Sequence, residues 1–391
     1  MDKRRIRTLA ASLAAGALLA PVLVVMTATS SLADEGDSVW TTGLGAQGQL
    51  GNGSTASRTS FGQVASLLGV DEVHGGREHV LALVDGAVWA WGDGIKGATG
   101  LGSTAVRTMP TLVSGVATGT TTVTNVSTGH YHSLALLSDG TVRSWGFNAM
   151  GQLGDGTTTK RLRPVTVAGL STVTDIVGGR DMSYALLADG TVRAWGGGAN
   201  GELGNGSLTA RQTRPVIVSG LSGVVAMAGG RNHGVALTSD GSVMTWGLNT
   251  SGQLGDGTKT SRSTPVRVSG ISTAVAVAAG ADHSVALLSD GRVFVWGEAG
   301  RGQLGNGSTT DRTTPVQVTG LPAVVALGCG RDHTHVVTTA GELWAWGQND
   351  YGQLGDGTTT RRTRPVRVPG ITDAVEISGG RGYTVLRRNP A

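Results

Sequence analysis

Histidines recur in this sequence at a regular interval, and they are the first residues to test for chemistry. Five of the eight occupy the same place in successive segments of about fifty residues: His79, His132, His233, His283 and His333. Met182 and Tyr383 hold that place in two further segments. Polar groups that recur in a buried position are usually hydrogen-bonded by structural partners. We therefore predict that these imidazoles bond to backbone between neighbouring repeats, with a functional role as the minor alternative.

Adjacent histidine and serine residues suggest a catalytic triad, as at His283 and Ser284 beside Asp282. Consecutive residues of a strand point to opposite faces of a sheet, so the imidazole cannot take the proton of the neighbouring hydroxyl. We therefore predict no nucleophilic catalysis at these pairs.

The spacing of possible ligands also disfavours a metal site. Zinc takes three or four ligands, and no third ligand converges on the paired histidines, which are His130 with His132 and His333 with His335. Calcium takes six to eight oxygens, whereas a repeat offers at most one carboxylate before this loop glycine: Asp155, Asp256 and Asp356 in three repeats, with Asn52, Asn205 and Asn306 in three others. We assign these Asp-Gly steps to turns. No phosphate loop or dinucleotide fingerprint occurs, so the sequence predicts no metal and no cofactor.

All these positions belong to a repeat of about fifty residues. A Trp-Gly pair followed by GQLG or a close variant marks six copies, at Trp91, Trp145, Trp195, Trp246, Trp296 and Trp346. A seventh copy begins at Gly43, where Thr42 replaces the tryptophan, and Trp40 lies on the same strand face as a partial substitute. Self-similarity at such a period is typical of repeat folds such as propellers.

Each repeat is expected to form four short strands. The stretch from Val275 to Trp296 contains three alternating apolar runs, broken at Gly280 and at Asp290-Gly291. Asp-Gly between apolar runs is a strong hairpin signal. The Pro-Val segment later in the repeat, preceded by an arginine that we interpret as solvated or loop-bracing, adds a fourth strand. Four antiparallel strands make one propeller blade.

The two chain ends each carry half of a repeat. The segment from Val375 to Arg387 has the histidine-type strand without a following Trp-Gly pair. The segment from Val39 to Gly51 has the Trp-Gly-type strand and the GQLG motif without a preceding histidine-type strand. Joining them removes the open sheet edges that promote aggregation. The sequence therefore predicts an all-β fold, a seven-bladed β-propeller over residues 34–391 closed by a composite blade from both chain ends.

The first 33 residues have the features of a signal peptide. Four basic residues precede an apolar run from Leu9 to Met26, and Ser31-Leu32-Ala33 supplies small residues for cleavage. We predict a secreted protein cleaved after Ala33, with no membrane contact afterwards; a retained anchor or cell-envelope association is the alternative.

Charge and cysteine content limit the partners and cross-links of the mature protein. Removing the four basic residues and one acidic residue of the signal peptide leaves 27 Lys and Arg residues and 26 Asp and Glu residues, a net charge of +1. This gives no reason to expect a nucleic-acid partner. The one cysteine, Cys329, excludes an intramolecular disulfide, and we predict a buried, unreactive thiol. We expect a monomer.

The order of motifs resembles the regulator of chromosome condensation repeat. Gly-x-x-His-Ser-x-Ala-Leu, then Asp-Gly-x-Val-x-x-Trp-Gly, then Gly-Gln-Leu-Gly recurs over residues 37–389. The resemblance implies a propeller. It does not fix a function. The family's namesake is a nuclear nucleotide-exchange factor for a small GTPase, a role that the signal peptide disfavours.

Two other members of that family bear on function. The plant ultraviolet-B photoreceptor carries a tryptophan that the matching Gly230-Arg231-Asn232-His233 lacks, so light sensing is disfavoured. A secreted bacterial β-lactamase inhibitor protein is similar in fold and export. We therefore predict a non-catalytic module that binds an unidentified protein, or less readily a glycan, through one face. The alternatives are a propeller lyase or glycan hydrolase with an axial acid pair, and a β-lactamase-inhibitor-like protein or envelope scaffold.

Recognition residues are sought where the repeat varies. The two variable sets are the pair before the repeated histidine and the loop between Trp-Gly and GQLG. Binding hot spots favour Tyr, Trp and Arg, and a ring of inter-blade ion pairs is the structural alternative for the charged members. The candidate partner-binding residues are Glu78, Tyr131, Phe147, Asp181, Arg231, Asp282, Asp332 and Tyr351.

Overall fold

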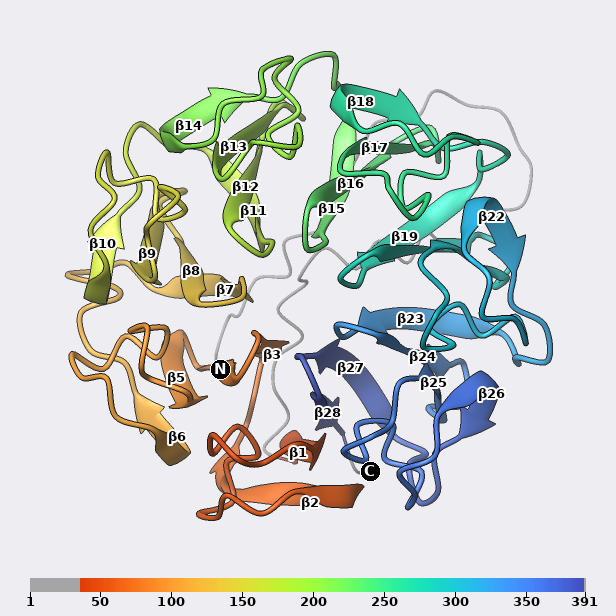
Figure 1. Cartoon of the computed structure of the whole chain (residues 1–391). Helices are drawn as coiled ribbons and strands as arrows, with labels where there is room; N and C mark the ends of the chain where they lie inside the picture. The colour runs from red at the N-terminus through yellow and green to blue at the C-terminus, as the bar shows by residue number, and fades with distance from the viewer. Residues whose placement is uncertain (1–35, 390–391) are drawn as a thin grey trace, which may run out of the picture.

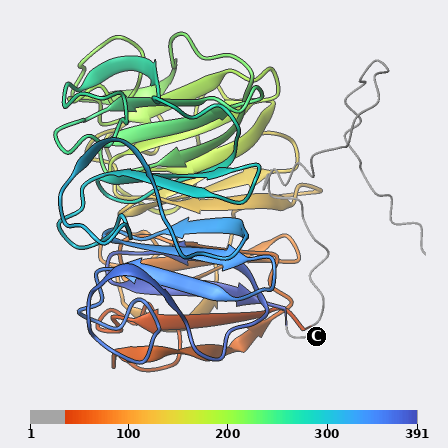
Figure 2. The ribbon, with the colours of Figure 1, turned by 90° about the vertical axis from the view of Figure 1, so that its right-hand side faces the viewer.

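The computed structural model describes residues 36–389, and every regular element within them is a β-strand. The strands form seven four-stranded antiparallel sheets around a central axis (Figure 1). The view turned by 90° shows these sheets as the blades of a disc (Figure 2). The predicted seven-bladed β-propeller is confirmed. The predicted signal peptide, residues 1–33, lies outside the described residues, and in the described part no helix is long and apolar enough to span a membrane.

Six blades are built from consecutive strands, and in each of them the strands follow one another from the axis outwards. They are β3 (Glu72–Gly75), β4 (His79–Val84), β5 (Ala87–Gly92) and β6 (Arg107–Leu112); β7 (Val123–Thr128), β8 (His132–Leu137), β9 (Val142–Gly146) and β10 (Arg161–Thr166); β11 (Val173–Gly178), β12 (Met182–Leu187), β13 (Val192–Gly196) and β14 (Gln212–Ile217); β15 (Val224–Gly229), β16 (His233–Thr238), β17 (Val243–Gly247) and β18 (Arg262–Arg267); β19 (Ala274–Ala279), β20 (His283–Leu288), β21 (Val293–Gly297) and β22 (Arg312–Gln317); β23 (Val324–Cys329), β24 (His333–Thr338), β25 (Leu343–Gly347) and β26 (Arg362–Arg367).

The seventh blade joins the two ends of the chain, as predicted. Its strands run inwards as β2 (Arg58–Leu68), β1 (Ser38–Gly43), β28 (Tyr383–Arg388) and β27 (Ala374–Gly379). Strands β1 and β28 pair without interruption from Ser38 opposite Arg388 to Gly43 opposite Tyr383. The buried guanidinium of Arg387 also forms ion pairs with Asp37 and Glu376. Backbone pairing and a buried ion pair therefore both close the ring.

Tryptophans fill the seams between blades. All six Trp-Gly indoles are fully buried. Each indole N–H donates to a backbone carbonyl in the GQLG-type motif of the preceding blade, as Trp296 does to Gln253 at 2.9 Å. The last glycine of that motif, Gly255, has φ +66°, and an added Cβ would lie 2.7 Å from the Trp296 Nε1. Glycine is therefore required where the ring is seated.

The seam at the composite blade is filled by Phe61 as well as by the predicted Trp40. Thr42 is buried, and its hydroxyl donates to the carbonyl of Gly352 at 2.9 Å. An added Cβ at Gly355 would meet the ring of Phe61, from the outer strand β2, at 2.4 Å. Trp40 is only partly buried and lies 4.4 Å from the Arg388 guanidinium. Phe61 therefore lies against the motif glycine in place of the missing ring, while Trp40 and Phe61, both partly buried, pack against the same apolar cluster.

The repeated histidines also bridge the seams, although not to backbone as predicted. Each Nε2 meets a Ser or Thr hydroxyl of the next blade, at 2.9 Å for His233 and Ser284. That hydroxyl donates to the carbonyl of Gln253, at 2.9 Å, so it must accept its second hydrogen bond from the imidazole N–H. The same arrangement occurs in the other blades that carry a histidine, at 2.8–3.0 Å: His79–Ser133, His132–Ser183, His283–Thr334 and His333–Thr384.

Where a blade lacks the histidine, the next blade also lacks the hydroxyl that would bind it. Met182 stands where a histidine is expected, and the next blade carries Gly234 in place of the hydroxyl. Tyr383 is followed in the next blade by Val80. Burial lowers the pKa of His233 to about 4, so its imidazole is neutral at pH 7. The pairs therefore act as neutral hydrogen-bonded ties between blades.

The buried ion pair at the closure gives a first prediction. We expect Arg387→Met to lower the free energy of unfolding by about 3–5 kcal/mol, because it leaves the buried Asp37 carboxylate without its cation. Urea denaturation measures the change. The control is Arg292→Met, which breaks the half-exposed pair with Asp290 and should cost less than about 1 kcal/mol. Equal losses in the two variants would contradict a closing role for Arg387.

The histidine ties give a second prediction through a double-mutant cycle. His233→Met with Ser284→Gly reproduces the natural combination of Met182 and Gly234. Each single change leaves one buried partner unsatisfied, at about 1–3 kcal/mol, so the double variant should lose about 1–2 kcal/mol less than the sum. Pairing His233→Met with the distant Ser133→Gly is the control, and it should be additive within about 0.5 kcal/mol. If the losses of free energy of unfolding were additive in both cycles, His233 and Ser284 would not be energetically coupled.

Candidate binding face

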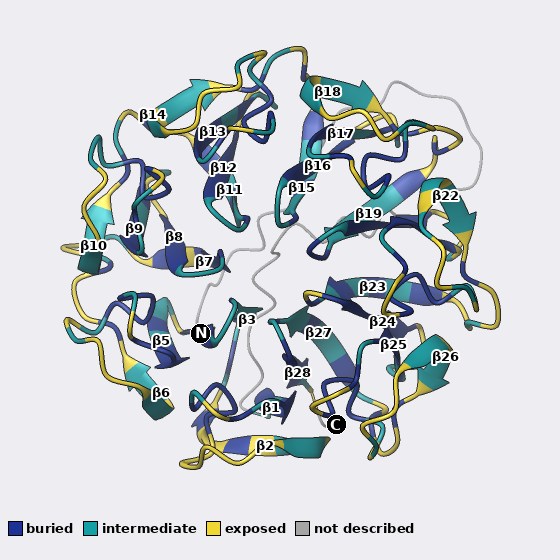
Figure 3. Ribbon diagram, in the orientation of Figure 1, coloured by how far each residue is buried: buried dark blue, intermediate teal, exposed yellow. Residues whose placement is uncertain are grey.

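Both variable sets of residues lie in loops at the same face of the disc. One set is in the loops between first and second strands, and the other is in the loops between third and fourth strands. Backbone hydrogen bonds join the two sets within a blade: the N–H of Phe147 donates to the carbonyl of Tyr131, and that of Glu298 to Asp282, each at 2.8 Å. Exposed residues are concentrated in loops and outer strands (Figure 3). All eight candidate residues therefore lie on one face.

The four candidate acids are all engaged by arginines. Within a blade, Asp181 Oδ2 lies 3.1 Å from Arg180 Nε, and Asp332 Oδ2 lies 3.3 Å from Arg331 Nε. Between blades, Asp282 meets Arg231 at 3.6 Å. Burial raises the pKa of Asp181, Asp282 and Asp332. The inter-blade ring that we considered as a structural alternative is therefore present only in part, because two of the four acids pair within their own blade.

Glu78 is shared between two arginines. Its Oε1 accepts a hydrogen bond from Arg381 Nη1 at 3.1 Å and lies 3.8 Å from Arg77 Nε. One carboxylate therefore faces two guanidinium groups, and the buried carboxyl of Asp93 lies within electrostatic range of Arg77.

The aromatic candidates divide into two places. Tyr131 and Phe147 meet edge to face, with ring centroids 6.4 Å apart. Arg77 lies 4.9 Å from the Tyr131 ring, and Lys96 lies 5.5 Å from the Phe147 ring. Tyr351 lies against Gly382 and is 42% exposed. The structure therefore unites Tyr131 with Phe147 and leaves Tyr351 separate.

An axial cavity of about 300 Å³ opens among the inner strands and the loops that follow them. The cationic and imidazole residues of its wall are Arg77, His130, Arg180, Arg231, Arg331 and Arg381. Burial, together with the neighbouring guanidinium groups, lowers the pKa of His130 to about 3. Of this set we predicted a functional role only for Arg231. The signal that could have found the others is the arginine two positions before the repeated histidine place, which recurs in five blades.

The paired histidine and hydroxyl of a seam are not arranged for nucleophilic catalysis. Ser284 is fully buried and directs its proton to a carbonyl, so His233 cannot act on it as a base. Within residues 36–389 no group of three His, Cys, Asp or Glu side chains is placed to hold a metal ion.

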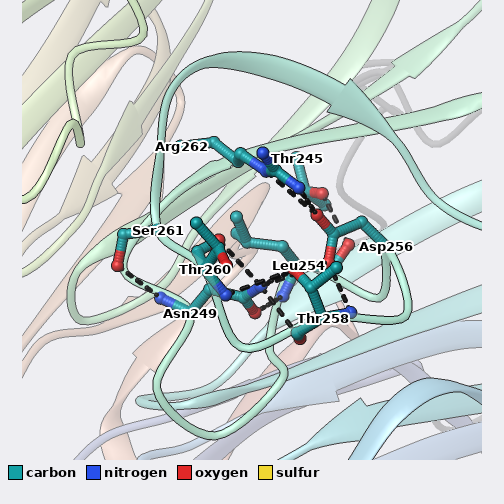
Figure 4. Close-up of polar contacts among 8 residues, drawn as sticks. All are labelled: Thr245, Asn249, Leu254, Asp256, Thr258, Thr260, Ser261 and Arg262. Carbon is teal, nitrogen blue, oxygen red and sulfur yellow. Dashed lines mark hydrogen bonds and ion pairs between the residues drawn. The ribbon is translucent and has the colours of Figure 1, made fainter.

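The Asp-Gly loops have the structural role that we predicted. Asp256 accepts hydrogen bonds from the backbone N–H and hydroxyl of Thr258 and from the Arg262 guanidinium (Figure 4). Asn249 crosses the same loop and donates to the carbonyls of Thr258 and Thr260, each at 3.1 Å. Equivalent arginine–aspartate pairs occur at Arg161–Asp155 and Arg362–Asp356. These three arginines brace loops, which is one of the two roles we gave them.

Fold and face define a class of protein: a seven-bladed propeller whose seam residues repeat and whose loops on one face vary. The RCC1-like domain family model matches residues 115–386, and the regulator of chromosome condensation (RCC1) repeat model matches residues 85–136. The chain therefore belongs to the RCC1-like domain family.

Curated relatives match over about a third of the chain. Probable E3 ubiquitin-protein ligase HERC6 of Homo sapiens is 35% identical over 141 residues, which are 34% of this chain and 14% of that protein. E3 ubiquitin-protein ligase HERC2 of Homo sapiens is 34% identical over 143 residues, which are 36% of this chain and 3% of that protein. The chain thus corresponds to a small part of either ligase.

Solved structures match over the whole propeller. Prp20p of Saccharomyces cerevisiae has a TM-score of 0.82 at 23% identity, covering 92% of this chain and 93% of that chain. Human WBSCR16 has a TM-score of 0.81 at 25% identity, covering 90% of this chain and 100% of that chain. These likenesses agree with the fold derived above.

Cys329 in the cavity wall gives a third prediction. The side chain is half-buried at the end of β23, and burial raises its pKa to about 12. At pH 8 only about one thiol in ten thousand is then ionised, so the native protein should react with DTNB far more slowly than a free cysteine. Labelling should become fast in guanidinium, which serves as the control. Rapid labelling of the native protein would contradict this environment.

Proposed function

We propose that this chain is an exported, non-catalytic module that binds a protein through the face carrying Tyr131, Phe147, Arg231 and Tyr351. The main observation behind this proposal is the separation of roles within the repeat. The repeated Trp, His and Gln residues are buried in the seams, whereas the residues that differ between blades lie together in loops on one face. Such a scaffold can change its partner without losing its fold.

The relatives and the aromatic side chains support this proposal. The structural study of Prp20p describes its binding to Gsp1p and histones, and another structure has Kap60 bound to yeast RCC1 (Prp20). On the chain itself, Tyr351 is 42% exposed, and Tyr131 and Phe147 form an aromatic pair beside two cations. Rigid aromatic groups of this kind contribute much of the energy of many protein interfaces.

Export is the second part of the proposal. It rests on the basic and apolar pattern of residues 1–33. The partner is therefore sought among secreted and cell-surface proteins.

The test begins with capture and then measures affinity. The chain, tagged at its C-terminus, is used to isolate partners from the secreted and cell-surface proteins of its producer. The isolated partner is then titrated with Tyr131→Ala, Phe147→Ala, Arg231→Ala and Tyr351→Ala. We expect these variants to weaken binding by about 1–3 kcal/mol while their melting temperatures stay near that of the parent.

Arg312→Ala on the outer strand β22 is the control, and its affinity should equal that of the parent. Unchanged affinity in all four face variants would contradict this binding face. Finding residues 1–33 retained on a cytoplasmic protein would contradict export.

A further inference from the structure

Arginines from five of the seven blades line the mouth of the axial cavity. The cavity wall includes Arg77, Arg180, Arg231, Arg331 and Arg381, and the inner strands that precede them surround the axis (Figure 1). The acids that follow them in the sequence or in the next blade, Glu78, Asp181, Asp282 and Asp332, are not part of that wall. The arginine residues therefore belong to the cavity wall, and the carboxylates that pair with them lie outside it.

The arginines at the mouth have hydrogen-bonding capacity left over. A guanidinium group has five N–H donors, and the ring has five guanidinium groups for four carboxylates. The Nε of Arg77 is buried and has no hydrogen-bond partner within the described residues. Its carboxylate, Glu78, lies at 3.8 Å and is already bonded by Arg381. The Nε of Arg77 is itself covered, but the five arginine side chains are 29–42% exposed, so part of each remains open to a ligand.

The backbone holds this ring in a fixed shape. The N–H of Arg381 donates to the carbonyl of Arg77, and that of Arg77 to His130, at 3.1 and 3.2 Å. On the other side of the cavity, the backbone N–H of Arg231 donates to the carbonyl of Ala281. The N–H of Ala281 donates to the carbonyl of Arg331, and both distances are 2.9 Å. Neighbouring blades are therefore tied directly at the positions that bear the cations, and the cavity mouth is organised before any ligand arrives.

We propose that the mouth of the axial cavity is a binding site for a compact, multiply charged oxyanion such as a phosphoryl group. Planar guanidinium forks match the oxygens of such groups with two parallel hydrogen bonds. The volume of about 300 Å³ admits a small anion or an anionic end group. The near-neutral charge of the residues after Ala33 is compatible with this local site, because the site depends on five side chains and not on a broad basic surface.

The experiment titrates pyrophosphate into the purified full chain at pH 7 and low salt, followed by calorimetry and by the shift in melting temperature. No protein partner is present, so the result is independent of the protein-binding proposal. We expect saturable binding that raises the melting temperature and weakens as salt is added. A peptide with one phosphoserine between glycines is the second probe. Binding of pyrophosphate alone assigns the site to a free anion, and binding of both probes assigns it to a phosphoryl group on a larger molecule as well.

Paired variants separate binding from folding. Arg331→Gln should weaken pyrophosphate binding about tenfold or more, as the loss of a charge-assisted hydrogen bond implies. Asp332→Asn should strengthen it severalfold, because it removes the carboxylate that competes for Arg331. Arg312→Gln, on the outer strand, should bind like the parent. Failure of both probes to bind would overturn the proposal, as would equal affinity in Arg331→Gln, Asp332→Asn and the parent.

Discussion

The backbone carbonyl of the glutamine position in each GQLG-type motif is the point on which the seams depend. At Gln253 it accepts the indole N–H of Trp296 and the hydroxyl of Ser284, both at 2.9 Å, and that hydroxyl in turn accepts from His233. The carbonyl of Gln253 thus binds Trp296 and Ser284 of the following blade. Ser284 in turn binds His233, which lies in the same blade as Gln253. The indole N–H, the hydroxyl and the imidazole Nε2 of each such seam are thus hydrogen-bonded within the protein, although the Nδ1 of His233 has no partner within the described residues.

The fold could be predicted from the sequence because this seam repeats. The spacing of Trp-Gly fixes the blades, Asp-Gly marks the hairpins, and the incomplete repeats at the two ends require one another. The filling of the composite seam could not be predicted, because Phe61 enters from the outer strand, where the pairing of β1 with β2 shifts register between Thr41 and Gly43. The alternation of side chains along β1 predicted only Trp40 at this seam. Likewise, the partner of each histidine lies about fifty residues away in the next blade, beyond the reach of a strand-face argument.

The candidate face could be predicted in part. Variation at fixed repeat positions selected two sets of loops, and the structure places both sets on one face, because strand order determines which loops share a side. It did not reveal which acid pairs with which arginine: Asp181 and Asp332 use the arginine of their own blade, whereas Asp282 uses that of the preceding blade. Nor did it reveal the axial cavity, since a cavity depends on how closely seven inner strands approach. An added Cβ at Gly379 would lie 2.5 Å from the Cα of Gly330. The paired glycines therefore set the width of the axis.

The ion pairs and the cationic mouth are two aspects of the same arrangement. Five guanidinium groups placed around one axis repel one another, and the energy of that repulsion rises as burial excludes water. The carboxylates behind them offset it and hold each side chain in position. Glu78 serves Arg77 and Arg381 together, so these two guanidinium groups share one directly paired carboxylate, and the Nε of Arg77 has no hydrogen-bond partner within the described residues. Interactions that look purely structural around the rim therefore determine where, and how strongly, the axis attracts an anion.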